Sequence, residues 1–275
     1  MPSPAESFAK RIAALITEVD NLSEASVKRA LVLLEGARKD IASQLAMIDP
    51  DTYTSAQLIG LRDRLKATVN EVLVRYHDEL DLSMSEATRI GNEVGDAMLS
   101  TLGLQSSAAR RTVEVLQGLS TEMVSGLGAY TRRHMDLVVS RLTLGAITPA
   151  QAVKMVAAEL PSRSVFTSLE SRAEAIVRTE TNRAFSIVTQ TRISQVARQA
   201  PGLKKQWVAV MDSATRPTHA EADGQVVGAN EPFVVGDYTA QYPRSPELPP
   251  EESVNCRCQV APVVDEEALA SAGIE

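Results

Sequence analysis

The sequence predicts a mainly α protein, in which long helical N-terminal and middle regions precede a small α+β C-terminal module with short strands. Hydrophobic residues make up 44% of the chain but aromatic residues only 4%, a composition that favours closely packed helices built from Ala, Leu, Val and Ile. Apolar positions repeat at helical spacing up to about residue 200, and short β-branched runs follow. We therefore predict three regions. They are a helical bundle or arm (1–103), a basic helical region (104–200) and a small β-containing module with an acidic tail (201–275).

The first two predicted helices have recognisable ends. Ser3 and Glu6 match a capping box, which predicts a helix that starts at Pro4. Asp20-Asn21 interrupts its apolar pattern, and Ser23 is then the expected cap of a second helix. Asp49-Pro50-Asp51 ends that helix, because the residue before a proline disfavours helical backbone.

A third helical pattern starts near Thr54. Ser83 and Glu86 match another capping box, so either a new helix begins there or one long helix continues through Leu99. Gly103 marks the break that follows. Long amphipathic helices joined by short loops are typical of a bundle or an extended helical hairpin.

The middle region continues the helical pattern. Gly118 and Gly145 interrupt it, and Thr148-Pro149 starts a short helix that ends at Pro161. A long helix follows, from about residue 168 to residue 198.

The middle region is also the basic part of an acidic chain. The net charge is −7, yet residues 101–200 contain 12 Lys or Arg against 7 Asp or Glu. Solvated helix faces explain such a pattern most simply. The functional alternative is a helical stripe that faces DNA or an acidic protein surface.

The last region changes to the pattern of a small β-containing fold. Gln206–Met211 is β-branched and aromatic, which predicts a buried strand with Trp207 as the anchor of a small core. Cys256–Val264 predicts a closing strand, whose alternation puts Cys256 and Cys258 on one face and Arg257 on the other. Two shorter extended pieces are expected between them, Gln225–Val227 and Phe233–Val235.

The remaining parts of this region have weaker patterns. Residues 238–253 are rich in Pro and are expected to be irregular. Asp265–Glu275 is an acidic tail that we expect to fray.

Asp212, His219, Cys256 and Cys258 are the candidate metal ligands. Zinc accepts such a set, and small β modules often depend on a structural metal. Structural zinc sites, however, usually present Cys at C-x₂₋₄-C spacing, whereas this chain has C-x-C. The alternative is a pair of reduced cysteines, at least one of them in the core, with His219 in hydrogen bonds. We favour this alternative, so no cofactor is expected and a structural zinc is the one candidate.

Catalysis by the same residues is an alternative from another class. A nuclease or toxin-like hydrolase would use His219 with Cys256 or Cys258, and it would need a thiol of lowered pKa. The chain has no phosphate-binding Gly loop and no H-E-x-x-H motif. We therefore expect no catalytic residues and no enzyme. In this structural interpretation Asp212 pairs with Arg216 across the turn, and Asn255 satisfies backbone groups in a loop.

Several short motifs together resemble the phage Mu F-like head morphogenesis family. In chain order they are Arg178-Thr179-Glu180-Thr181, the strand from Trp207 to Asp212, Thr215-Arg216-Pro217-Thr218-His219, Gly224 and Asn255-Cys256-Arg257-Cys258. Each motif alone is weak, but their order and spacing between about Thr148 and Val264 are specific. This chain departs from the family at Ser213-Ala214, where an additional Arg is more frequent, and at Tyr242–Pro246, where a Pro-Gly-Asp-like turn is common.

The resemblance implies a minor head (minor capsid) protein of a tailed phage or prophage, acting in head morphogenesis. Its expected partner is the portal protein inside the capsid, with the major capsid protein or scaffold as further partners. Packaged double-stranded DNA is an additional expected partner, through residues 101–200. The expected location is the virion, in the capsid interior near the portal, after synthesis in the host cytoplasm. No membrane partner is expected, because no apolar run approaches the roughly 20 residues that span a bilayer.

Overall fold

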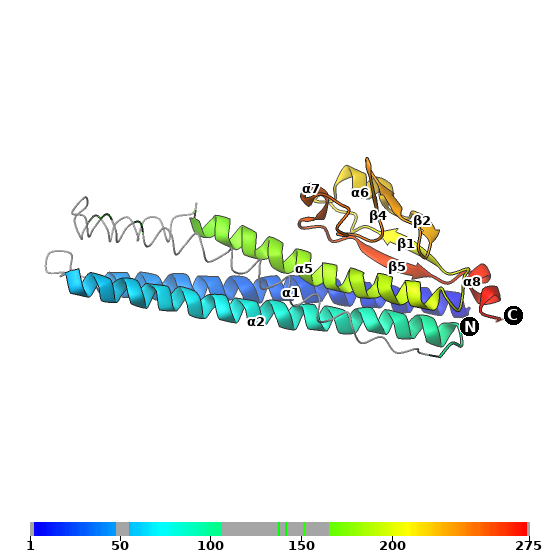
Figure 1. Cartoon of the computed structure of the whole chain (residues 1–275), viewed down its shortest axis with the longest axis horizontal. Helices are drawn as coiled ribbons and strands as arrows, with labels where there is room; N and C mark the ends of the chain where they lie inside the picture. The colour runs from blue at the N-terminus through cyan, green and yellow to red at the C-terminus, as the bar shows by residue number, and fades with distance from the viewer. Residues whose placement is uncertain are drawn as a thin grey trace. The chain divides into compact units, whose positions relative to one another are not determined.

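The computed structural model describes residues 3–47, 55–105 and 165–273, together with Leu137, Arg141 and Gln151. Three long helices are followed by a small module of short strands and helices (Figure 1), which confirms the predicted fold class. The long helices are α1 (Pro4–Ala46), α2 (Ser55–Thr101) and α5 (Val165–Val196). None of the helices in the described ranges combines the length and the apolar character that crossing a membrane requires.

The chain forms two compact units that are discontinuous in sequence. The first consists of Met1–Ser26, Leu82–Gln117 and Ile176–Glu275. The second consists of Val27–Asp81 and Gly118–Ala175. The first unit therefore takes segments from all three regions predicted from the sequence, and it contains the whole C-terminal module.

Helix α1 begins at the predicted capping box. The backbone N–H of Ser3 donates to Glu6 Oε2 (2.8 Å), and the backbone N–H of Glu6 donates to Ser3 Oγ (3.2 Å). The predicted break at Asp20-Asn21 is wrong, because α1 continues without interruption to Ala46. Ser23 is therefore not a cap. It is buried within α1, where its hydroxyl accepts a hydrogen bond from Asn182 Nδ2 (2.9 Å).

Helix α2 resolves the choice left open at Ser83. One helix runs through this position to Thr101, and the buried Ser83 hydroxyl forms a hydrogen bond of 2.6 Å with the Thr181 hydroxyl. The break expected at Gly103 is confirmed. Its φ of +60° is the left-handed conformation that commonly ends helices.

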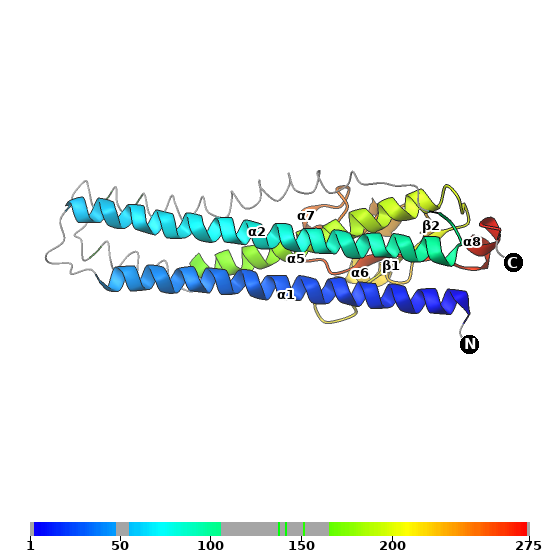
Figure 2. The same cartoon turned by 90° about the horizontal axis from the view of Figure 1, so that it is seen from below.

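In the second unit, α1 and α2 are antiparallel (Figure 2). Residues early in this part of α1 contact residues late in α2, and residues later in α1 contact residues earlier in α2. Helix α5 contacts α2. Two hydrogen bonds join α1 and α2, from Arg29 Nε to Glu79 Oε1 (2.8 Å) and from Gln44 Nε2 to Thr68 Oγ1 (2.9 Å). A third joins α2 to α5, from Tyr76 Oη to Ala173 O (2.8 Å).

In the first unit, α5 packs closely on α2. A Cβ added at Gly95 would lie 2.0 Å from Arg192 Nε, so only glycine permits this approach. Arg192 is buried there and donates through Nη2 to Asp96 Oδ1 (3.0 Å). The predicted helix 168–198 agrees with α5. The expected end of the second helix at Asp49-Pro50-Asp51, the interruptions at Gly118 and Gly145 and the helix from Thr148-Pro149 to Pro161 lie outside the described residues.

The module contains a three-stranded antiparallel sheet with the order β2-β1-β5. The central strand is β1 (Lys204–Val208), and its neighbours are β2 (Val226–Gly228) and β5 (Gln259–Val263). The hairpin of β3 (Phe233–Val235) and β4 (Tyr238–Ala240) turns at Gly236.

The predicted first and last strands are present but shorter than expected. Strand β1 ends at Val208, because the Ala209 N–H donates to the Asp223 side chain (2.8 Å) instead of a neighbouring strand. Strand β5 begins at Gln259, because the carbonyl oxygens of Cys256 and Cys258 accept from Arg244 Nη1 (2.9 and 2.6 Å).

Two expectations of irregular structure are wrong. Residues 238–253 contain β4 and a short helix, α7 (Pro250–Ser253). The acidic tail forms α8 (Glu266–Ser271), which Asp265 caps by accepting from the Ala268 N–H (3.0 Å). Lys204 Nζ fixes this helix to the sheet through ion pairs with Asp265 (3.0 Å) and Glu267 (2.7 Å).

Trp207 anchors the module core, as predicted. Its side chain is fully buried, with ring centroids of Phe233 and His219 at 5.5 and 5.6 Å in edge-on geometry. On the same strand, Lys205 is also fully buried. Its Nζ donates to Gln190 Oε1 (3.1 Å) and to the backbone and side-chain oxygens of Gln241 (2.8 and 3.1 Å). Burial lowers the pKa of Lys205 to about 8.

The stability that Lys205 contributes is expected to increase in alkaline solution. Between the folded pKa of about 8 and the ordinary value of 10.5, the unfolded chain binds more protons, so raising the pH favours the folded state. Over that interval we expect wild type to gain up to about 3 kcal/mol relative to Lys205→Met. Urea unfolding of both proteins at pH 7.5 to 10.5 measures the difference. Lys28→Met is the control because Lys28 is exposed on α1, and a pH-independent difference between wild type and Lys205→Met would contradict the prediction.

Candidate functional site

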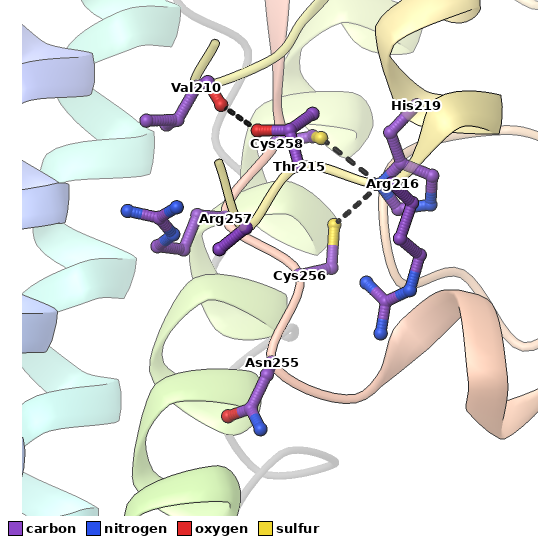
Figure 3. A pocket seen from close by; sticks show the side chains of 9 residues that line it. Val210, Thr215, Arg216, His219, Asn255, Cys256, Arg257 and Cys258 are labelled. Atoms are coloured by element: carbon purple, nitrogen blue, oxygen red, sulfur yellow. Dashed lines mark hydrogen bonds between the residues drawn. The ribbon is translucent and has the colours of Figure 1, made fainter. Parts of the chain in front are cut away.

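The structure brings three of the four candidate metal ligands together. His219 lies on α6 (Pro217–Ala222), and Cys256 and Cys258 lie just before β5. His219 Nδ1 is 3.6 Å from Cys256 Sγ and 3.3 Å from Cys258 Sγ (Figure 3). The three residues are 2%, 2% and 3% exposed, so the group is closed to bulk solvent.

Asp212 is the candidate that does not join this group. Its carboxylate forms an ion pair with Arg257, which lowers the pKa of Asp212. The predicted pair of Asp212 with Arg216 is therefore wrong, and Arg216 Nη2 donates instead to Val254 O (2.7 Å). Arg257 points away from both sulfur atoms (Figure 3), as strand alternation predicts.

Glu252 of α7 lies beside the imidazole of His219. Its Oε2 lies 3.0 Å from His219 Nε2 and accepts a hydrogen bond from Thr218 Oγ1 (3.0 Å). The carboxylate therefore occupies one side of the imidazole and leaves Nδ1 facing the sulfurs. Sequence patterns did not indicate Glu252, since it is one of several acidic residues in a Pro-rich segment.

Asn255 sets the backbone course into the two cysteines. Its φ of +59° lies in the left-handed region, which Asn tolerates better than most residues. Its backbone N–H donates to Thr179 Oγ1 of α5 (3.0 Å). The Asn-Cys-Arg-Cys motif thus begins with the residue that this turn requires.

Arg244 is the central side chain beneath the site, and sequence reasoning missed it. It is fully buried and donates through Nη1 to the carbonyl oxygens of both cysteines. Its Nη2 has three acceptors on or next to α5, namely Asn182 O (3.0 Å), Ser186 Oγ (2.7 Å) and Gln259 Oε1 (2.9 Å). One guanidinium therefore joins the cysteine segment to the helix.

The Arg-Thr-Glu-Thr motif of α5 also has a structural role. Thr179, Glu180 and Thr181 are buried, although polar residues usually face solvent. Thr179 accepts from the Asn255 N–H (3.0 Å), and Thr181 is bonded to Ser83 of α2 (2.6 Å). The neighbouring Asn182 accepts from Gln259 Nε2 (2.6 Å) and donates to Ser23 of α1 (2.9 Å), so this face of α5 connects three elements.

The two thiols have different acidities. A hydrogen bond from Cys258, the Arg244 guanidinium and His219 lower the pKa of Cys256 well below its usual range, although burial opposes them. The hydrogen bond with Cys256 and burial raise the pKa of Cys258.

A small cavity adjoins the sulfur atoms and His219 (Figure 3). Its volume is about 20 Å³, which accommodates one water molecule or one ion but no organic substrate. The lining residues are Val210, Ala214, Thr215, Arg216, His219, Asn255, Cys256, Arg257 and Cys258. Within the described ranges, His219, Cys256 and Cys258 are also the one group of three side chains with metal-ligand geometry.

The sequence of this chain is similar to one protein family and to several known proteins. Residues 138–261 match the family described as Phage Mu protein F like protein. The chain is similar to NAD(+)--arginine ADP-ribosyltransferase EFV of Enterococcus faecalis, with 38% identity over 34% of this chain and 19% of that protein. It is also similar to the uncharacterized protein YqbB of Bacillus subtilis, with 37% identity over 26% of this chain and 25% of that protein. An uncharacterized protein of Haemophilus influenzae is 26% identical over 63% of this chain and 36% of that protein.

The chain thus spans between 19% and 36% of the lengths of these curated relatives. No solved structure matches it. The family match covers the second part of the chain, which includes α5, the sheet and the residues around His219. The resemblance predicted from the sequence is therefore confirmed: residues 138–261, somewhat under half of the chain, match the family described as Phage Mu protein F like protein.

Proposed function

We propose that the protein is a minor head protein that associates with the portal inside the capsid during head assembly. The observation that carries the proposal is the match of residues 138–261 to the phage Mu protein F like family. The site supports a structural role, because both sulfur atoms are buried and the adjoining cavity is too small for a substrate. The transferase named among the relatives matches over 19% of its length, so we do not transfer its activity.

The paired long helices supply the surface for docking on the portal. Several large apolar side chains on them are exposed, including Val32 (70%), Ile59 (49%) and Val74 (61%) of the second unit. Exposed apolar side chains of this size lose water-accessible area when a protein partner covers them. This surface lies on the parts of α1 and α2 that belong to the second unit.

The basic middle region has fewer available charges than the sequence indicates. Within the described part of α5, three arginines already pair with carboxylates of this chain. These pairs are Arg178 with Glu24 (3.0 Å), Arg183 with Glu180 (2.6 Å) and Arg192 with Asp96 (3.0 Å). Exposed Arg172 and Arg198 remain. A contact with DNA or an acidic portal surface therefore depends on these two and on the Lys and Arg between residues 106 and 164.

Neutralising four arginines of this region is expected to weaken portal binding by roughly tenfold, which corresponds to about 1.4 kcal/mol. The variant carries Gln at Arg110, Arg111, Arg132 and Arg133. Co-purification with the portal at several protein concentrations measures the change. The control places Gln at Lys10 and Arg11, two exposed charges of α1 that lie outside the second unit and its exposed apolar side chains.

The same variants separate a portal contact from a DNA contact. If the arginines bind phosphates, the slope of log affinity against log salt for double-stranded DNA falls by about 0.9 for each lost contact. If the four-arginine variant and the control variant bind the portal equally well, the basic region is not the portal-binding site. A DNA slope that is unchanged from wild type would remove DNA as a partner of this region.

A further inference from the structure

The three buried ligand atoms near α6 have the spacing of a tetrahedral metal site. Zn–S bonds of about 2.3 Å and Zn–N bonds of about 2.0–2.1 Å put a nitrogen and a sulfur ligand roughly 3.6 Å apart. His219 Nδ1 is 3.6 Å from Cys256 Sγ and 3.3 Å from Cys258 Sγ. All three atoms lie within 4.8 Å of one another. The two nitrogen–sulfur distances therefore match those around one tetrahedral zinc ion to within about 0.3 Å.

The surroundings of His219 have the second feature of a metal centre. A metal-bound imidazole generally has a hydrogen-bond acceptor at its other nitrogen, which fixes its tautomer and orientation. Glu252 Oε2 lies 3.0 Å from Nε2, which is ion-pair distance, but the pair lacks hydrogen-bond geometry, so a bound metal requires a small reorientation of the two side chains. The hydrogen bond from Thr218 Oγ1 (3.0 Å) holds the carboxylate itself in position.

The third feature is the cavity on the open side of the group. It borders all three ligands and has room for one water molecule, which is the usual fourth ligand where a protein supplies three. No fourth His, Cys, Asp or Glu of the described residues joins the group. Asp212, the fourth candidate from the sequence, is paired with Arg257 instead.

The C-x-C spacing, which counted against a metal in the sequence, is explained by the local backbone. Both cysteines directly precede β5, and their sulfur atoms point to the same side while Arg257 points away (Figure 3). Arg244 holds both carbonyl oxygens (2.9 and 2.6 Å), which fixes the segment in this conformation. Longer spacing is needed where a turn must bring the two sulfurs together, and here no such turn is required.

We propose that His219, Cys256 and Cys258 bind one zinc ion, with water in the adjoining cavity as the fourth ligand. Two sulfur ligands and one imidazole favour a borderline-soft ion over magnesium or calcium, which prefer oxygen. The site connects α6 to the segment before β5, and so closes a loop of more than thirty residues in the small module. Zinc there would therefore crosslink these two segments, with one coordination position left to water.

The test measures metal content and spectroscopy of the full-length protein. We expect about one zinc per chain after expression with zinc, and its removal by a chelator under reducing conditions is expected to lower the melting temperature by about 5 to 10 °C. Cobalt added to the metal-free protein is expected to give visible bands of tetrahedral coordination and thiolate-to-metal charge transfer. The metal-free wild type decides the question even if the cysteine variants do not fold.

Four variants define the ligand set. His219→Gln, Cys256→Ser and Cys258→Ser are each expected to lower zinc content at least tenfold after dialysis. Asp212→Asn is the control and is expected to retain about one zinc, because its carboxylate is bound to Arg257. Loss of zinc from Asp212→Asn would overturn the three-residue ligand set. Two titratable thiols with no bound zinc, or a Cys256–Cys258 disulfide in the purified protein, would overturn the proposal.

Discussion

Replacement of Arg244 by Met is expected to destabilise the folded protein by about 3 to 5 kcal/mol. The guanidinium is fully buried and donates to five backbone or side-chain oxygens of the cysteine segment, α5 and β5. Met fills a similar volume but donates no hydrogen bond, so these acceptors are left buried and unsatisfied. Arg244→Lys is expected to recover only part of the loss, because an ammonium has three donors on a single nitrogen.

Urea unfolding followed by tryptophan fluorescence measures this effect in the module itself, because Trp207 is the only tryptophan in the chain. The matched control is Arg257→Met, which removes an ion pair whose partner Asp212 is exposed. Exposed ion pairs of this kind contribute about 1 kcal/mol or less. Equal losses for Arg244→Met and Arg257→Met would show that Arg244 does not organise the site.

Trp207→Ala is expected to have a comparable effect, a loss of about 3 to 5 kcal/mol. The indole is fully buried between Phe233 and His219, whose ring centroids lie 5.5 and 5.6 Å away. Truncation to Ala removes these edge-on contacts and leaves a cavity in a module whose core has few large side chains. Trp207→Phe keeps an aromatic ring and is expected to lose less, about 1 to 2 kcal/mol.

Fluorescence cannot report on Trp207→Ala, so circular dichroism or calorimetry is the measurement for this variant. Tyr238→Ala on β4 is the control, because its side chain is 41% exposed. A substitution at such a position usually changes stability by no more than about 0.5 kcal/mol. If Trp207→Ala unfolds at the same denaturant concentration as Tyr238→Ala, the module does not depend on its aromatic core.

The long helices were predictable in kind because their signals are local. Apolar spacing located them, and the capping box of Ser3 and Glu6 located the start of α1. Two further cap signals, at Ser23 and Ser83, were misleading or ambiguous. Both side chains lie inside long helices, where Asn182 and Thr181 of α5 bind their hydroxyl groups. Those partners are far away in the chain, so no local pattern could separate a buried polar contact from a cap.

The candidate site was predictable in part. Residue types and strand alternation indicated that Cys256 and Cys258 face one side and Arg257 the other. The pairing of Asp212 was wrong, because Arg257, rather than the nearby Arg216, reaches its carboxylate. Arg244 and Glu252 gave no signal, since each acquires its role from residues that only folding brings near.

The sequence by itself determined the fold class, the anchoring role of Trp207 and the family resemblance, because these depend on periodicity, residue type and the order of short motifs. Tertiary structure alone decided that α1 and α2 are uninterrupted, that Arg244 joins the Asn255-Cys256-Arg257-Cys258 segment to α5, and that His219 meets both sulfurs. The physical reason is that a buried polar group is stable only beside its partner. Here those partners come from different elements, and their distances are set by packing rather than by spacing along the chain.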